Sequence, residues 1–228
     1  MNSKQRGLSP FKAKVPDRLP MWYGAAPETT QNIMKYVGAR SENEALYEIL
    51  GIDYKTIRPR YIGKPFKEFD DGTVENEWGL RRAGYHWGQA VNHPLGNAES
   101  IRDIEKYRFP NPDDWDVKIS NEELMDAEGF CVIGGTWAPF FHDAAELIGM
   151  EQFFIKMYED PGLIEALIEK CFEFYYEINI RVFKTNPGVI DMYFMGNDFG
   201  SQRGLLMSPQ LWRSFFKPRL CKMIDLAH

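Results

Sequence analysis

The sequence lacks several features that would place the protein in a specialised class. It has only three cysteines, Cys131, Cys171 and Cys221, at wide spacing within apolar sequence. Such cysteines indicate small core residues in a reducing compartment, not a disulfide framework. No run approaches the ~20 apolar residues that a membrane-spanning helix needs, and the basic N-terminal tail lacks the apolar core of a signal peptide. We therefore expect a cytoplasmic protein without a membrane partner.

The sequence also lacks an excess of positive charge. Its 33 acidic residues outnumber 27 lysines and arginines, which gives a net charge of −6 and no basic stripe for nucleic acid. It contains no CxxC or HExxH motif and no glycine-rich loop that ends in Gly-Lys-Ser/Thr. We expect no nucleic-acid partner and no metal held by this chain. A small molecule remains the simplest ligand.

The sequence does contain enough apolar material for a large core. It is 44% hydrophobic, with 16 Phe, 11 Tyr and 6 Trp. Short apolar runs alternate with longer segments of helical periodicity, which is typical of an α/β fold with a parallel sheet. The predicted strands are 18–24, 54–62, 130–134 and 189–195, and the predicted helices include 28–37, 42–50, 141–148, 152–158 and 161–184.

One domain is predicted over residues 18–228, preceded by an arm at 1–17. The arm is basic and we expect it to be solvated and partly mobile. Asp70-Asp71-Gly72 is a tight-turn signal between two candidate strands, Lys64–Phe69 and Thr73–Trp87. We interpret residues 64–90 as a hairpin-like insertion into the α/β domain.

Polar side chains follow two of the predicted strands. Asp198 comes after the strand at 189–195, with Asn197, Gln202 and Arg203 in the same loop. A carboxylate there can accept a proton or hold an NH-bearing substrate, although capping the loop or pairing with Arg203 is the alternative. Trp137 follows the strand at 130–134 and two glycines, where it can form a flat wall for a ligand.

Three further groups carry possible chemistry. His142 and Glu146 lie one helical turn apart, a spacing that can hold a metal, although an ordinary histidine at a helix start is the preferred interpretation. Glu77 precedes Trp78, and burial beside the indole would raise its pKa. Four arginines can bind substrate carboxylates or pair with the surplus acids: Arg58, Arg60, Arg81 and Arg82.

Three segments resemble the uroporphyrinogen decarboxylase superfamily. The first segment, residues 196–225, reads GNDFGSQRGLLMSPQLWRSFFKPRLCKMID and is similar to the D-x-G-x-Q-x-G-x-x-x-S-P-x-x-(W/F)-R-x-F-x-x-P segment of that superfamily. The second, residues 134–168, reads GGTWAPFFHDAAELIGMEQFFIKMYEDPGLIEALI and is similar to its helix pair. The third, residues 19–28, reads LPMWYGAAPE and is similar to its first strand. The resemblance covers nearly the whole chain. It implies a TIM-type (β/α)8 barrel, of which this chain would hold about the first half to two-thirds, with nothing after His228 to close the sheet.

The superfamily holds two chemistries. Porphyrinogen decarboxylases, which are lyases of porphyrin biosynthesis, use an arginine-rich loop after strand one. Corrinoid-dependent methyltransferases pass a methyl group from a methylated corrinoid protein to a thiol that zinc activates. This chain has no arginine pair at Met21–Pro27, so the resemblance favours the methyltransferase branch. Its zinc motif would fall beyond His228, so zinc and corrinoid are expected for the full-length enzyme, and this chain alone is expected to bind no cofactor and to be inactive.

The resemblance implies the following roles. Asp198, Gln202 and Glu77 are the candidate catalytic residues, and the candidate substrate-binding residues are Tyr23, Trp137, Asn197, Arg203 and His142. One alternative is a uroporphyrinogen decarboxylase with a divergent entrance. The other is a non-catalytic remnant that binds a partner, because an open sheet edge favours homo-oligomers.

Overall fold

The chain forms two compact units, each built from segments that are distant in the sequence. The computed structural model describes residues 1–83 and 88–228. The first unit combines Met1–Arg58, Lys118–Gly135 and Thr185–Phe194, and the second combines Pro59–Val117, Thr136–Lys184 and Met195–His228. Residues 1–17, expected as a separate arm, belong to the first unit.

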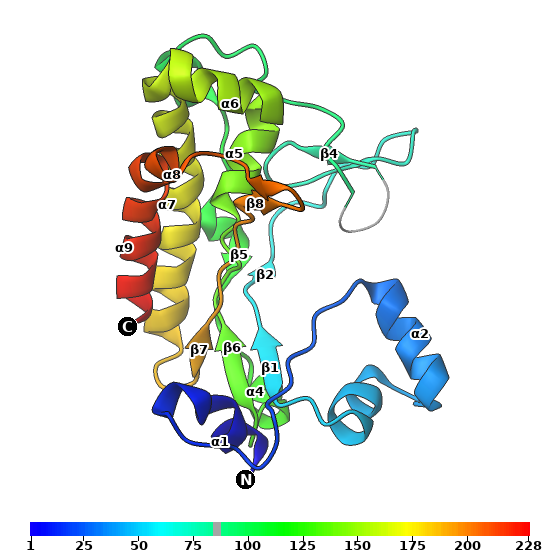
Figure 1. Ribbon diagram of the computed structural model, residues 1–228. Coiled ribbons are helices and arrows are strands. Elements are labelled where there is room, and N and C mark those ends of the chain that lie inside the picture. Colours follow the sequence, from blue (N-terminus) through cyan, green and yellow to red (C-terminus); the bar gives the residue numbers. More distant parts are fainter. Residues whose placement is uncertain (84–87) are drawn as a thin grey trace. The chain divides into compact units, whose positions relative to one another are not determined.

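A parallel sheet of three strands organises the first unit (Figure 1). Its order is β1 (Tyr54–Ile57), β6 (Cys131–Gly134) and β7 (Met192–Tyr193). The register pairs Ile57 with Gly134 and Gly134 with Tyr193. The predicted α/β class with a parallel sheet is therefore confirmed, while no barrel closes within the part of the chain that the structure describes.

The core of this unit explains the sequence around the sheet. Ile57, Ile119, Ala127 and Val132 form a buried cluster, against which Val189 and Ile190 pack. A Cβ atom at Gly134 would lie 2.5 Å from the Ile190 side chain, so only glycine fits at this point of β6. α4 (Asn121–Asp126) begins with a capping box at Ser120.

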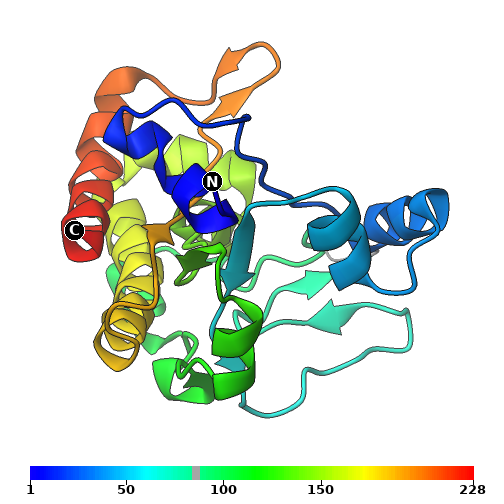
Figure 2. The same ribbon diagram turned by 90° about the horizontal axis from the view of Figure 1, so that it is seen from below.

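The expectation of a solvated N-terminal arm is wrong for residues 3–9, where Arg6, Gly7 and Ser9 are buried, whereas residues 10–15 are exposed. α1 (Ser3–Leu8) lies against the start of β1 and β6 (Figure 2), and Arg6 and Gly7 are buried. The reason is the carboxylate of Asp53, which is fully buried and accepts from the guanidinium of Arg6 at 2.7 Å and of Arg18 at 2.6 Å. A short 3-10 turn, η1 (Pro10–Lys12), follows α1.

The strand predicted at Arg18–Gly24 is wrong. This stretch is irregular, because its backbone bonds to Asp53 and not to a neighbouring strand: the Met21 amide donates to the Asp53 carboxylate at 2.9 Å. The helices predicted next are confirmed as α2 (Pro27–Val37) and η2 (Glu44–Ile49), the latter a π-helix.

Helices dominate the second unit. Their bounds are α5 (Phe140–Ile148), α6 (Met150–Glu159), α7 (Pro161–Thr185), α8 (Pro209–Phe215) and α9 (Lys217–Ala227). The first three lie close to the predicted ranges. α7 and α9 lie side by side (Figure 1), joined by an ion pair between Arg219 and Glu169 at 2.5 Å. A short helix, α3 (Ile101–Lys106), begins after a capping box at Ser100.

Short antiparallel pairs complete the second unit. β2 (Arg60–Tyr61) pairs with β5 (Trp115–Asp116), after the 3-10 turn η3 (Pro112–Asp114). β3 (Val74–Glu75) pairs with β4 (Arg81–Arg82), and β8 (Gly200–Ser201) with β9 (Gly204–Leu205).

The turn at Asp70-Asp71-Gly72 is confirmed, since the Phe69 amide donates to the Thr73 carbonyl at 2.9 Å. The single strand predicted over Thr73–Trp87 is wrong for 73–83. The Asn76 side chain accepts from the Trp78 and Leu80 amides, both at 3.0 Å, and turns the chain there. Residues 84–87 of that prediction lie outside the described residues.

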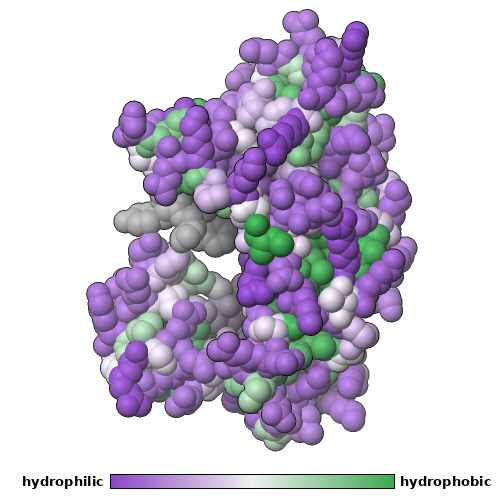
Figure 3. Space-filling model, turned by 180° about the vertical axis from the view of Figure 1, so that it is seen from behind, coloured by the Kyte–Doolittle hydropathy of each residue, from purple (hydrophilic) through white to green (hydrophobic). Residues whose placement is uncertain are grey.

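The surface and the cysteines differ in part from expectation. Cys131 and Cys171 are buried as predicted, but Cys221 is exposed on α9. The face in Figure 3 is mostly hydrophilic, with hydrophobic residues in small groups. In the described ranges, no helix combines the length and the apolar character needed to cross a membrane.

Candidate functional site

Asn197 lies in the segment after β7 and forms two hydrogen bonds with the segment after β6. Its side-chain oxygen accepts from the Phe141 amide at the start of α5, at 2.9 Å. Its side-chain nitrogen donates to the carbonyl of Ala138 at 3.0 Å. Both polar atoms are thus used by the backbone, which gives Asn197 a structural role; binding of a substrate by this residue stays a prediction.

Trp137 packs against Gly196, the residue that precedes Asn197. The Gly196 amide donates to the Trp137 carbonyl at 2.9 Å, and a Cβ at Gly196 would lie 1.7 Å from the indole nitrogen. Ala138, next in the chain, is fully buried with φ of +51°, a conformation that costs energy for a residue with a side chain. The indole and Asn197 therefore share a tightly constrained turn.

Asp198, Gln202 and Arg203 are exposed. They lie before and within the β8–β9 hairpin, where the Ser201 hydroxyl accepts from the Arg203 amide at 3.2 Å. These residues were predicted to lie in a loop, and the hairpin was not predicted. Their catalytic and binding roles remain predictions.

His142 and Glu146 lie on α5, as predicted, but Glu146 has a cation partner. The guanidinium of Arg82 binds the Glu146 carboxylate at 2.5 and 3.1 Å. His142 is half-buried, and its Nδ1 is buried without a hydrogen bond to the described residues. Burial lowers the pKa of His142, and the charges of Asp198 and Glu146 oppose that shift. The imidazole is therefore held neutral.

Asp143 is the most perturbed acid near these residues, and the sequence analysis gave it no role. Its carboxyl is buried in the core and accepts from the hydroxyl of Tyr175 on α7 at 2.5 Å. Burial raises the pKa of Asp143 to about 8, and the charges of Glu77 and Glu146 add to this shift. A carboxylic acid that keeps its proton at neutral pH therefore lies next to the Arg82–Glu146 pair.

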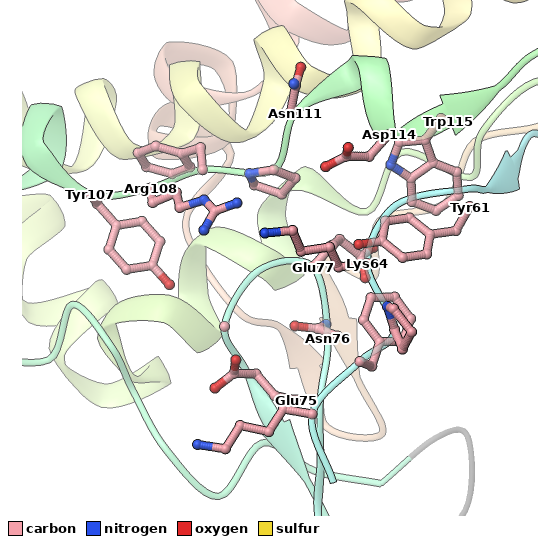
Figure 4. A pocket seen from close by; sticks show the side chains of 16 residues that line it. Tyr61, Lys64, Glu75, Asn76, Glu77, Tyr107, Arg108, Asn111, Asp114 and Trp115 are labelled. Carbon is pink, nitrogen blue, oxygen red and sulfur yellow. The ribbon is translucent and has the colours of Figure 1, made fainter.

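Glu77 lies in the insertion, on the wall of a pocket of about 340 Å³ (Figure 4). Burial raises the pKa of its carboxyl, as the sequence analysis predicted for a glutamate beside a buried tryptophan. Trp78 is buried, and its ring packs against that of Tyr175 at 5.7 Å. The same packing thus connects Glu77 to the Asp143–Tyr175 pair.

The remaining candidates are placed elsewhere or are paired. Tyr23 belongs to the first unit, where its hydroxyl bonds to Thr30 at 2.8 Å. Arg60 and Arg81 pair with Asp116 and Asp71 at 2.6 and 2.7 Å, which confirms the alternative of pairing with acids for both.

A metal site was weighed for the His142–Glu146 spacing. Across residues 1–83 and 88–228, no three His, Cys, Asp or Glu side chains come close enough together to hold a metal ion. The zinc that the family resemblance implies for the full-length enzyme stays a prediction.

Comparison with known proteins identifies a related fold. No protein-family model matches the chain, and no curated protein matches it in sequence. A solved structure, a methyltransferase from Methanosarcina mazei, matches with a TM-score of 0.57 at 18% sequence identity. The match covers 100% of this chain and 68% of the methyltransferase. At this level of identity the likeness establishes a shared fold and leaves the reaction open.

Proposed function

We propose that this protein belongs to the uroporphyrinogen decarboxylase superfamily and transfers a methyl group from a methylated corrinoid to a thiol-type acceptor. The observation that carries the proposal is the likeness in fold, over the whole chain, to a protein named as a methyltransferase. The motif similarity at 196–225 supports the superfamily and its TIM-type barrel. The corrinoid donor and the thiol acceptor come from that sequence resemblance.

In such a transfer the sulfur of the acceptor attacks the methyl carbon. The new S–C bond forms as the bond between the methyl group and the donor breaks, and the donor keeps the electron pair. The thiol proton must leave, because the thiolate is the nucleophile. A neutral imidazole is in the protonation state that accepts this proton, and burial favours that state in His142.

The other candidate residues receive the following roles in this proposal. Asp198 and Gln202 orient the substrate or the corrinoid from the β8–β9 side, where both are accessible to solvent. Trp137 lines the mouth of the site, and Glu77 acts from the insertion. Arg203 and Asn197 complete the substrate contacts.

The alternative of a porphyrinogen decarboxylase requires arginines near the first strand that bind substrate carboxylates. The N-terminal segment up to residue 24 has two arginines, Arg6 and Arg18. Both bind the buried carboxylate of Asp53. Because a guanidinium in such a pair is occupied, this observation favours methyl transfer over decarboxylation.

Parallel assays on the product of the whole gene test the proposal. In one, methylcobalamin and 2-mercaptoethanol are supplied with and without zinc, and the methyl thioether is measured by mass spectrometry. In the other, uroporphyrinogen is supplied and coproporphyrinogen is measured by fluorescence. Thioether formation supports the proposal. Coproporphyrinogen without thioether would overturn it, and no product in either assay would favour the non-catalytic alternative.

A further inference from the structure

We propose that the second unit binds a small aromatic anion, a planar ring that carries a carboxylate or a phosphate, in the pocket beside the insertion. The pocket has a volume of about 340 Å³, within the range of small-molecule sites. It lies between residues 61–79 and 107–115 (Figure 4). The inference does not depend on methyl transfer, because it rests on this pocket alone.

Aromatic rings form two walls of the pocket and are held in place by their neighbours. On one side, Tyr61 stacks on Phe66 with ring centres 4.6 Å apart and meets the edge of Trp115 at 5.4 Å. On the other side, Tyr107 meets Phe109 edge-on at 5.2 Å, and its hydroxyl donates to the Trp78 carbonyl at 2.6 Å. Fixed aromatic faces favour a planar ligand that can stack between them.

Two cationic side chains, Lys64 and Arg108, point into this space from the two walls (Figure 4). Neither makes an ion pair with any residue that the structure describes, although carboxyl groups line the same pocket. Both remain exposed to solvent, so an entering ligand can reach them. A guanidinium and an ammonium together are the usual partners of a carboxylate or a phosphate.

A third donor lies in the wall. The indole NH of Trp115 is buried and finds no acceptor among the described residues. Leaving a buried donor without a partner is unfavourable, so an anionic oxygen that accepts from it gains affinity. Burial also raises the pKa of Glu77, another residue of the pocket wall.

Isothermal titration calorimetry with phenyl phosphate and benzoate tests this inference on the unmodified chain. Inorganic phosphate lacks the ring and benzyl alcohol lacks the charge, so each is expected to bind at least about tenfold more weakly than the aromatic anions. No heat of binding from either aromatic anion at millimolar concentration would overturn the proposal. Equal binding of inorganic phosphate would also overturn it.

Three substitutions sharpen the test. Arg108→Gln and Lys64→Gln are each expected to weaken the binding of phenyl phosphate by about tenfold, and Trp115→Phe, which keeps the ring and removes the NH, by a smaller factor. Arg213→Gln makes the same charge change on the exposed surface of α8 and should leave the affinity unchanged. An equal loss in Arg213→Gln, or no loss in the two pocket variants, would contradict a specific site. Melting temperatures of all variants exclude unfolding as the cause.

Discussion

Two stretches of the second unit follow strands of the parallel sheet and carry polar residues, but one stretch is buried and the other is exposed. The stretch at 136–148, which includes α5, buries Asp143 and Phe141 in the core. The stretch at 198–205, with the β8–β9 hairpin, leaves Asp198 and Leu205 exposed. Their positions after successive strands are similar, but their surroundings differ. Position in the chain therefore predicts which residues are neighbours, whereas burial decides which carboxyl groups have a shifted pKa.

The largest effect is expected from truncating a ring in the buried stretch. Phe141 is fully buried and packs against the rings of Phe153, Phe199 and Phe216. Phe141→Ala should lower the free energy of unfolding by about 3–5 kcal/mol, because it removes buried area and leaves a cavity. Chemical denaturation measures this change.

Leu205→Ala in the hairpin is the matched control, since Leu205 is 68% exposed. Its effect should stay within about 0.5 kcal/mol. Similar losses of unfolding free energy in Phe141→Ala and Leu205→Ala would contradict the difference in burial between the two stretches.

The next effect concerns pH. Asp143 keeps its proton in the folded state up to a pKa of about 8, above the ordinary aspartate pKa of 3.8 in the unfolded chain. Between these values the unfolded state binds fewer protons, so the stability of the native protein should fall as pH rises, by up to about 1.4 kcal/mol per pH unit. Below pH 4 both states are protonated and the penalty is absent.

Asp143→Asn should therefore flatten the decline in stability between pH 4 and 8. Denaturation curves at several pH values, for this variant and for Asp198→Asn, measure the difference. Asp198 is exposed, so its variant should keep the slope of the parent protein. A parent protein whose stability does not fall over this range would contradict the burial of an Asp143 carboxyl whose hydrogen-bond partner is the neutral Tyr175 hydroxyl.

Much of the fold could be predicted from local patterns, and the reasons for the failures are physical. Apolar spacing gave α5, α6 and α7, and a continuous apolar run gave β6. The strand at 18–24 failed because a distant residue, Asp53, holds that backbone. The β8–β9 hairpin was missed because its strands have two residues each, too short for any periodicity.

The candidate site was predictable only in part. The resemblance to the family segment at 196–225 pointed to Asn197 and Asp198. No local pattern in the sequence predicts that both polar atoms of the Asn197 side chain form hydrogen bonds with the backbone. The burial of Asp143 could have been predicted from the sequence, because this residue falls on the apolar face of α5 together with Phe140 and Leu147. Tyr175 likewise falls in the apolar stripe of α7 with a hydroxyl that needs a partner.

A moderate effect is expected at Asn197. Asn197→Leu would leave the Phe141 amide and the Ala138 carbonyl without their partner, at a cost of about 1–3 kcal/mol. Asn197→Asp keeps the acceptor for the amide and should recover part of that loss. Thermal unfolding of both variants, beside Gln202→Leu on the exposed hairpin, measures the difference. Equal stability of the Leu and Asp variants would argue against the two hydrogen bonds.

An effect of similar size is expected from a steric change. Gly196→Ala places a methyl group where the Trp137 indole lies and should cost about 1–3 kcal/mol as the ring shifts. Gly200→Ala, four residues away, meets only the Gly204 carbonyl at 3.9 Å and is the control. A change in tryptophan fluorescence is expected for the first variant alone. The same fluorescence change in both would show that the Trp137 packing is not specific to Gly196.

The most direct test of the account is the transfer of a deuterium-labelled methyl group from methylcobalamin to 2-mercaptoethanol by the product of the whole gene. The account predicts labelled thioether, formed at least about tenfold more slowly by Asp198→Asn and at the parent rate by Asp225→Asn, an exposed acid on α9. The absence of labelled thioether from the parent protein, or an equal rate in both variants, would contradict it.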